Sequence, residues 1–236
     1  MRIRGLVVGA LVALVAGCGG EEDTPRALPQ GGQPVRLDPA DFGTEIDNPW
    51  WPMRPGSKWT YREGPQQVVV TVLDRTRDVN GIEARVVHDV VTEDGELVED
   101  TYDWYAQDDD GNIWYLGEDT KEFENGKVVS TEGSWEAGVD GAQAGILVPA
   151  EPKVGMTYRQ EYLEGEAEDA AEVLSLDARA RVPFGSFDGL LKTKDYTPLE
   201  PALLEHKYYA RDVGPVLAVT VRGGSGREEL IRFTSR

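Results

Sequence analysis

Short runs of apolar residues, many of them β-branched, alternate with turn residues along most of this chain. Residues 68–73 form one such run, and residues 82–91 place apolar side chains at every second position over much of their length. The dipeptides Asp94-Gly95 and Asn125-Gly126 lie between extended runs and are typical of tight β-hairpins. Gly111-Asn112 is expected to close another hairpin. The pattern therefore predicts a chain rich in antiparallel strands.

One segment fits a helix better than a strand. In residues 166–176, Ala167, Ala170, Ala171 and Leu174 recur at a spacing near that of a helix turn, which makes this segment the best helix candidate. Elsewhere the turn signals recur at short intervals, with no alternation of strands and helices. We therefore predict a mainly β fold, an antiparallel meander that forms a sandwich or an open barrel.

Two stretches early in the chain have echoes later in it. Residues 52–62 and 149–159 each contain prolines, then a glycine, and end in Thr-Tyr-Arg. Residues 102–108 and 206–212 each contain Tyr-Ala and are followed by a glycine turn and another predicted strand. The echoes come in the same order in both halves of the chain.

This order predicts two similar β units, 48–140 and 148–236, with chance similarity of strand and turn patterns as the alternative. If the units correspond, Tyr61 matches Tyr158 and Tyr105 matches Tyr209. A tyrosine just after a Pro-Gly turn can place its ring in the core and its hydroxyl at the rim, so we expect these rings to be buried.

The echoed motifs resemble a known group of proteins. A Pro…Gly…Trp-x-Tyr opening and a Tyr-Tyr-Ala…Val-Gly-x-Val close are similar to those of uncharacterised secreted bacterial β-domain proteins. The resemblance covers about half of the chain after its first residues. It implies a meandering antiparallel sheet and brings no assigned activity.

The N-terminus has the parts of a secretory signal peptide. Arg2 and Arg4 precede an uncharged, mostly apolar run, and small residues lead to Cys18, the only cysteine of the chain. The run is shorter than the roughly 20 apolar residues that span a bilayer. The segment Val15-Ala16-Gly17-Cys18 resembles the lipobox of bacterial lipoproteins. This resemblance implies diacylglyceryl transfer to the Cys18 sulfur, cleavage before Cys18 and a membrane anchor there.

The resulting organisation has three parts. Residues 1–17 are the expected signal peptide, and residues 18–47 are expected to form a lipidated N-terminus and a disordered tether, because they are rich in Gly, Pro and charge. Residues 48–236 are the expected β-rich domain. Because the only cysteine is expected to carry lipid, no disulfide bond can form, and the stability of the domain must come from its apolar core.

The charge balance excludes some partners. The chain carries 43 acidic and 24 basic residues, for a net charge of −19, and loss of residues 1–17 would remove two arginines and no acid. Such a field repels nucleic acid and anionic headgroups. We therefore expect no nucleic-acid partner, and a membrane contact only through the anchor.

Motifs for chemistry are few. His88 and His206 are the only histidines of the chain. We interpret His88 as a residue of a sheet and His206 as an exposed residue, rather than as metal ligands. The acidic turn 108–112 does not fit the spacing of a calcium-binding EF-hand loop and is interpreted as a polar hairpin tip. Gly223-Gly224-Ser225 lacks the later glycine of a nucleophile elbow. No catalytic residue, metal ligand or cofactor-binding residue is nominated.

Aromatic residues are concentrated in the first predicted unit, among them Trp50, Trp51, Trp59, Trp104 and Trp114. Strand aromatics usually fill a core, and the alternative is a groove for a glycan, peptide or lipid. We favour the core.

These observations predict a membrane-anchored, extracytoplasmic lipoprotein of the cell envelope. Its β-domain is expected to be non-enzymatic, with a binding or structural role toward an envelope protein, a glycan or a hydrophobic ligand. One alternative is a carrier of lipid or another hydrophobic ligand. A second is an envelope hydrolase that uses carboxylates, although spacing alone nominates no pair of acids.

The lipobox generates the first testable prediction. Cells that express the full chain and grow with radiolabelled palmitate should incorporate label into the wild-type protein and none into Cys18→Ala. The variant should also leave the membrane fraction, because a lipid anchor depends on the Cys18 sulfur. Equal labelling of the two proteins would contradict the anchor.

Overall fold

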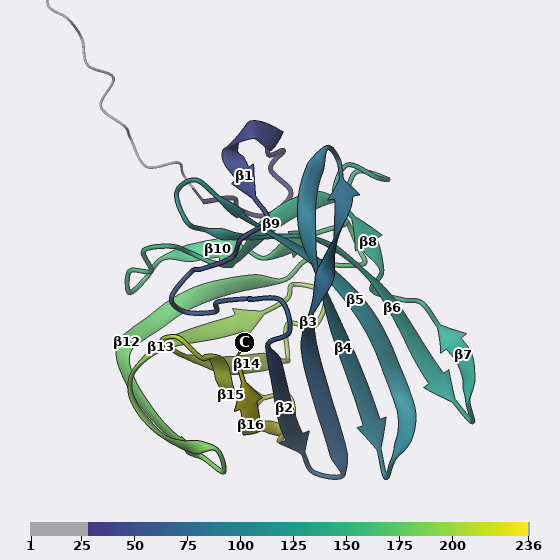
Figure 1. Cartoon of the computed structure of the whole chain (residues 1–236), viewed down its shortest axis with the longest axis vertical. Helices are drawn as coiled ribbons and strands as arrows, with labels where there is room; N and C mark the ends of the chain where they lie inside the picture. Colours follow the sequence, from purple (N-terminus) through teal and green to yellow (C-terminus); the bar gives the residue numbers. More distant parts are fainter. Residues whose placement is uncertain (1–27, 236) are drawn as a thin grey trace, which may run out of the picture.

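The computed structural model describes residues 28–235, and nearly all of the regular structure in this range is β-strand (Figure 1). A three-residue 3₁₀ helix, Pro39–Asp41, precedes the first strand. The strands of the described part are β1 (Phe42–Gly43), β2 (Lys58–Glu63), β3 (Gln66–Val79), β4 (Ile82–Glu93), β5 (Glu96–Asp108), β6 (Ile113–Glu124), β7 (Lys127–Ser130), β8 (Trp135–Glu136), β9 (Gln143–Val148), β10 (Thr157–Arg159), β11 (Glu161–Tyr162), β12 (Ala170–Val182), β13 (Gly185–Tyr196), β14 (Leu204–Ala210), β15 (Gly214–Arg222) and β16 (Arg227–Thr234).

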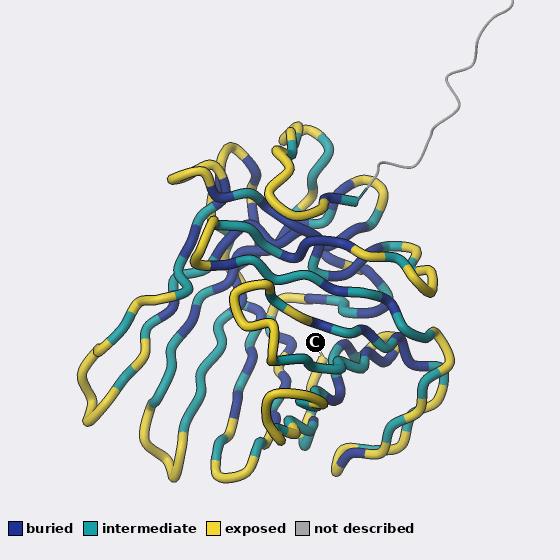
Figure 2. Tube along the Cα trace, turned by 180° about the vertical axis from the view of Figure 1, so that it is seen from behind, coloured by how far each residue is buried: buried dark blue, intermediate teal, exposed yellow. Residues whose placement is uncertain are grey.

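The predicted mainly β, antiparallel fold is confirmed. The strands follow the path β10-β12-β13-β14-β15-β16-β2-β3-β4-β5-β6-β9-β11, while β1 pairs with β5, and β7 and β8 pair with β6. The sheet curls into a nearly closed barrel, so of the two predicted arrangements the barrel is the one formed (Figures 1 and 2). Within residues 28–235, no helix has the length and apolar character that a bilayer span requires.

The expected hairpin signals lie at hairpins. Asp94-Gly95 joins β4 to β5, and Asn125-Gly126 joins β6 to β7. Asp94 and Asn125 have φ of 51° and 52°, the left-handed conformation that such two-residue turns require. Gly111-Asn112 lies in the turn between β5 and β6, as predicted.

The helix candidate at 166–176 is wrong. Most of this segment belongs to β12, which pairs with β13 along its length. Ala171 and Val173 are buried on one face while Glu172 and Leu174 lie only partly buried on the other, which is the period of a strand. Cross-strand hydrogen bonds and burial on the inner face of the sheet outweigh a helical spacing that rests on three alanines.

The folded region begins earlier than the expected boundary at residue 48. Leu28, Val35 and Leu37 pack against the core, and Ile46 is only 1% exposed. Hydrogen-bonding groups of the barrel hold the backbone of this segment, as where the amide of Arg159 donates to the Pro29 carbonyl at 2.8 Å. Composition cannot reveal such partners. The rest of the expected tether, the signal peptide and Cys18 lie outside the described residues.

The echoed Pro-Gly segments adopt the same local structure. The amide of Gly56 donates to the Val72 carbonyl at 2.8 Å, and the amide of Gly155 donates to the Val173 carbonyl at 2.8 Å. Both glycines have a φ of 86°, which an L-residue adopts only with strain. Each turn therefore directs the following strand to pair with a long strand in the same way: β2 pairs with β3, and β10 pairs with β12.

The echoed tyrosines also occupy similar places. Tyr61, Tyr158, Tyr105 and Tyr209 are 3%, 1%, 6% and 2% exposed, as expected. The pairing of β5 with β6 shifts register just before Tyr105, and the pairing of β14 with β15 shifts just before Tyr209. Trp51 contacts both rings, at centroid distances of 6.2 and 6.4 Å. Duplication of units 48–140 and 148–236 stays a prediction that these correspondences motivate.

A close backbone crossing brings the ends of the strand path together. A Cβ atom on Gly145 of β9 would lie 2.3 Å from the Gln160 carbonyl oxygen, so only glycine fits there. The Arg159 guanidinium donates to the Ala144 carbonyl at 2.6 Å, and β11 pairs with β9. These contacts tie β9, near one end of the path, to the β10–β11 segment.

Burial of the echoed tyrosines generates the second prediction. Tyr61→Ala and Tyr158→Ala should each lower the free energy of unfolding by about 3–5 kcal/mol, because each removes a buried ring and leaves a cavity. Tyr61→Phe, which loses only the hydrogen bond to the Pro215 carbonyl, should cost about 1 kcal/mol. Asp109→Ala on an exposed hairpin tip should be nearly neutral. Urea denaturation measures all four, and a neutral result for either alanine variant would contradict the packing.

Candidate functional site

A cavity of about 320 Å³ lies inside the barrel, between the first and second halves of the chain. We call it the inner pocket. Its walls combine aromatic, aliphatic and charged residues: Trp51, Tyr61, Val68, Val70, Asp89, Tyr105, Tyr115, Glu118, Leu147, Gln160, Glu161, Asp169, Lys207, Tyr209, Pro215, Leu217, Ala218 and Glu228.

The register of the sheet places acidic residues on the inner face. Asp89 of β4 lies opposite Val70 of β3, which also lines the pocket. Asp103 of β5 lies opposite Glu118 of β6, so two carboxylates are direct cross-strand neighbours. Alternation along each strand places Asp89 on the face of β4 that also holds Val87 and Val91, and Asp103 on the face of β5 that also holds Thr101 and Tyr105.

Burial perturbs the titration of these acids. Desolvation, reinforced by neighbouring carboxylates, raises the pKa of Asp89 and Glu118 to about 7. Desolvation also raises the pKa of Glu228 to about 7, against the charge of Lys207, which lowers it. Desolvation and the nearby Asp89 likewise raise the pKa of Asp103 to about 7, against hydrogen bonds from tyrosine hydroxyls that lower it. The Tyr115 hydroxyl donates to Asp103 at 2.7 Å. The acids of this region therefore change charge near neutral pH.

Two further carboxylates border the same space. Desolvation raises the pKa of Glu161 well above its ordinary value, and desolvation also raises that of Asp169. The Trp135 indole donates to Glu161 at 2.8 Å. Glu161 and Asp169 also line a neighbouring cavity of about 500 Å³, which reaches Gln30 and Gly31 near the start of the described chain.

One lysine offsets part of this charge. The Lys207 ammonium lies 3.2 Å from an Asp195 carboxylate oxygen. That carboxylate raises the pKa of Lys207 above its ordinary value, against the desolvation that lowers it, so the side chain stays protonated. The lining of the inner pocket therefore holds five carboxylates and one ammonium group.

Two residues that line the inner pocket each have a buried polar atom without a partner. Among residues 28–235, neither the Trp51 indole nitrogen nor the Asp89 Oδ1 atom has a hydrogen-bond partner, although both are shielded from solvent. Native proteins pair nearly all such atoms, so each exception calls for an explanation. One is a donor and the other is an acceptor.

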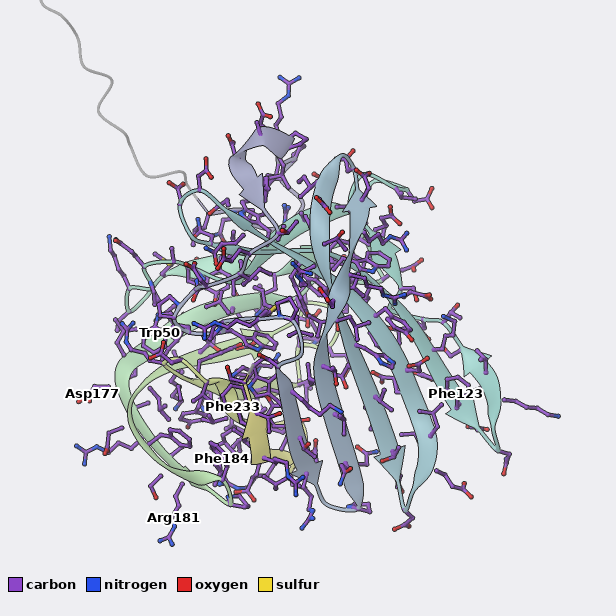
Figure 3. All side chains as sticks on the ribbon, viewed as in Figure 1. Trp50, Phe123, Asp177, Arg181, Phe184 and Phe233 are labelled. Atoms are coloured by element: carbon purple, nitrogen blue, oxygen red, sulfur yellow. The ribbon has the colours of Figure 1, made fainter. Side chains whose placement is uncertain are left out.

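The aromatic residues serve both of the roles weighed from the sequence. Trp59 and Trp114 are fully buried core residues. Trp51 instead lines the inner pocket and packs edge to face on Trp59, at a centroid distance of 6.2 Å. Away from the pocket, Phe184 beside the β12–β13 turn meets Phe233 of β16 at 6.4 Å (Figure 3). The preference for a core is therefore correct for most of the tryptophans and incomplete for Trp51.

The residues singled out in the sequence lie elsewhere. His88 stacks on Tyr102 with centroids 4.3 Å apart, and its Nε2 atom lies 2.5 Å from Asp100, which fits a sheet histidine. His206 lies on β14, which does not pair with the His88 strand β4. Within residues 28–235, no group of three or more His, Cys, Asp or Glu side chains is placed to hold a metal ion.

The acidic turn is only partly the exposed tip that was expected. Asp109 and Asp110 are exposed, but Asp108 is only 5% exposed. Its carboxylate accepts hydrogen bonds from the Trp114 indole at 2.7 Å and from the Asn112 amide at 2.7 Å. Asp108 therefore stabilises the β5–β6 turn from inside.

Sequence reasoning missed the acids of the inner pocket. A usable signal exists, because Asp89 interrupts an apolar strand and Asp103 stands between Tyr102 and Trp104. An acid at a position that the strand period directs inward is uncommon unless it has a partner or a function. The chain holds so many carboxylates that this signal was not separated from the exposed ones.

Comparisons with known proteins identify no family. No protein-family model matches the sequence, and no curated protein matches it. Among solved structures, the chain is similar to a “putative lipoprotein” from Parabacteroides distasonis, with a TM-score of 0.43 and 10% sequence identity. The match covers 78% of this chain and 98% of that one.

The titration of the pocket acids generates the third prediction. Their ordinary pKa values are 3.8 for Asp and 4.5 for Glu, against about 7 in the folded state. Between these values the folded state binds more protons than the unfolded state, so stability is full at low pH and is lost as the pH rises through about 7. Tm should therefore fall by several degrees between about pH 5 and pH 8.

A double variant provides the control for this pH dependence. Asp89→Asn with Glu228→Gln removes two of the titrating groups and should flatten the dependence of Tm on pH. Asp109→Asn, on the exposed turn, should leave it unchanged. Scanning calorimetry across this pH range measures both, and an equal slope in wild type and double variant would contradict the assignment.

Proposed function

We propose that the protein is a membrane-anchored, extracytoplasmic lipoprotein whose β-domain is a non-enzymatic binding protein, with the inner pocket as its binding site. The observation that carries this proposal is the pair of buried, unpartnered atoms, Trp51 Nε1 and Asp89 Oδ1, on two residues that line the pocket. A bound molecule that supplies an acceptor and a donor would satisfy both. Residues 15–18 support the anchor through their resemblance to a lipobox.

The anchor would keep the domain close to the membrane. Leu28 packs against the core, so residues 19–27 are all that separates Cys18 from the folded domain. At no more than about 3.5 Å per residue, this segment reaches at most about 35 Å. The domain would therefore meet ligands near the membrane surface of the envelope.

The chemistry of the pocket argues against a carrier of lipid. Five carboxylates line the space together with the aromatic residues. An alkyl chain would desolvate these groups without offering a hydrogen bond, which costs several kcal/mol for each group that stays charged. A polar ligand avoids this cost.

A carboxylate-dependent hydrolase is the second candidate, and one observation favours it. Asp103 and Glu118 face each other across β5 and β6, and both have a pKa raised to about 7, as a general acid requires. Against it, Asp103 is only 8% exposed and already accepts a hydrogen bond from Tyr115. An assay on envelope glycan fragments separates the candidates, because a hydrolase would lose its turnover in both Asp103→Asn and Glu118→Gln.

The binding proposal generates the fourth prediction. Wild-type protein extracted from its own membrane and examined by native mass spectrometry should carry a small molecule. Ala218→Phe should lose it, because Ala218 lines the inner pocket between Lys207 and Glu228 and a phenyl ring would fill the space.

Val154→Phe is the matched control for this experiment. Val154 is 66% exposed and lies outside the pocket, so the variant should retain the bound molecule. Circular dichroism confirms that both variants fold. The same bound mass in wild type and Ala218→Phe would contradict the pocket as the binding site.

A further inference from the structure

We propose that the inner pocket recognises an organic cation, a small molecule that carries a protonated amine together with a hydroxyl or carbonyl oxygen. This inference rests on the proposed function and deepens it by naming the chemical class of the ligand. Its support comes from three features of the pocket: its charge, its unpartnered atoms and its aromatic walls.

The charge of the lining favours a cation. Asp89, Glu118 and Glu228 approach the space from β4, β6 and β16, and Glu161 and Asp169 close another side. Lys207 is the one lysine in the lining, and its ammonium lies 3.2 Å from a carboxylate oxygen of Asp195, which does not line the pocket. A positive ligand would relieve repulsion among the acids, in surroundings where charges interact more strongly than in water.

The hydrogen-bonding groups favour an amine in particular. An ionised carboxylate only accepts hydrogen bonds, and an ammonium group donates three. The Asp89 Oδ1 atom is buried and has no donor among residues 28–235, and Asp89 is one of the residues that line the pocket. An ammonium placed against Asp89 would form a charge-assisted hydrogen bond, which is stronger than one between neutral groups.

The aromatic walls fit the same ligand. The Trp51 ring contacts the rings of Tyr105 and Tyr209, at centroid distances of 6.2 and 6.4 Å, and all three residues line the pocket. Aromatic faces attract ammonium groups by cation–π interaction. The unpartnered Trp51 indole N–H donates rather than accepts, so it requires an oxygen on the ligand.

The distribution of the acids fits an extended ligand better than a compact ion. Four of the five carboxylates come from four different strands and Asp169 directly precedes β12, and no group of three or more metal-ligating side chains forms among residues 28–235. A cavity of about 320 Å³ holds a molecule of several carbon atoms. Amines of this size, with a second polar end, match both unpartnered atoms.

A series of probes with one carbon skeleton tests the inference. Butane-1,4-diol, 4-aminobutan-1-ol and putrescine share a four-carbon chain and carry zero, one and two ammonium groups near neutral pH. Isothermal titration calorimetry on the lipid-free chain, Cys18→Ala, should show 4-aminobutan-1-ol binding at least about tenfold more tightly than the diol, because only the amine forms a charge-assisted bond. Putrescine should also bind more tightly than the diol.

Variants locate the effect in the pocket. Asp89→Asn keeps the shape of the side chain and removes its charge, so it should weaken 4-aminobutan-1-ol about tenfold and leave the diol unchanged. Glu228→Gln, on another strand, should also weaken binding of 4-aminobutan-1-ol and serves as the test if Asp89→Asn does not fold. Asp109→Asn, on the exposed β5–β6 turn, is the matched control and should bind both probes as wild type does.

The outcomes separate this inference from the proposed function. If the diol binds as tightly as the amines, the pocket recognises hydroxyl groups, and the inference is overturned while the binding function stands. If no probe binds, but native mass spectrometry finds a neutral molecule that Ala218→Phe loses, the inference is again overturned alone. If no probe binds and no molecule is retained, both fail. Amine binding that Asp109→Asn weakens as much as Asp89→Asn would assign the effect to general surface charge and overturn the inference.

Discussion

At Gly145 the backbone of β9 meets the carbonyl oxygens of residues 159 and 160 with no room for a side chain. The rest of the structure depends on this crossing. It brings the β10–β11 segment against β9, and the Arg159 guanidinium ties the two by donating to the Ala144 carbonyl. Without it the sheet would keep two long open edges and an inner face in contact with water. With the crossing in place, the inner face encloses the inner pocket, in which desolvation raises the pKa of acids such as Asp89.

Arg159 links this closure to the start of the folded chain. Its backbone amide holds Pro29, and its guanidinium holds Gln33 at 2.8 Å. Residues 28–47 therefore pack on the barrel through groups that also close it (Figure 1). The neighbouring cavity lies at this junction, because Gln30 and Arg159 line it, and it shares Glu161 with the inner pocket.

The two halves of the barrel have similar strand pairing but place different charged side chains at matching positions. Asp89 pairs with Val70 and Asp195 pairs with Ala171, each two residues before the carbonyl that receives the Pro-Gly turn. On the next strand of each half, Asp103 and Lys207 occupy matching register positions, because each lies opposite the residue two before Asp89 or Asp195. The second half thus satisfies its acid with a lysine, whereas the first half places a further acid there. In the first half, Asp103 lies opposite a second acid, Glu118, on the next strand.

Local patterns in the sequence were sufficient for the fold class, the main hairpins and the burial of the echoed tyrosines. Strand period, Asp94-Gly95 and Asn125-Gly126 act over a few residues, so they can be read without knowing the partner strands. The strand at 170–182, the packing of 28–47 and the closure at Gly145 depended on contacts between residues far apart in the chain. The inner pocket did as well. Sequence supplied 43 acidic residues, and only the register and curvature of the sheet decided which few of them turn inward, because burial is a property of the assembled sheet and not of any one strand.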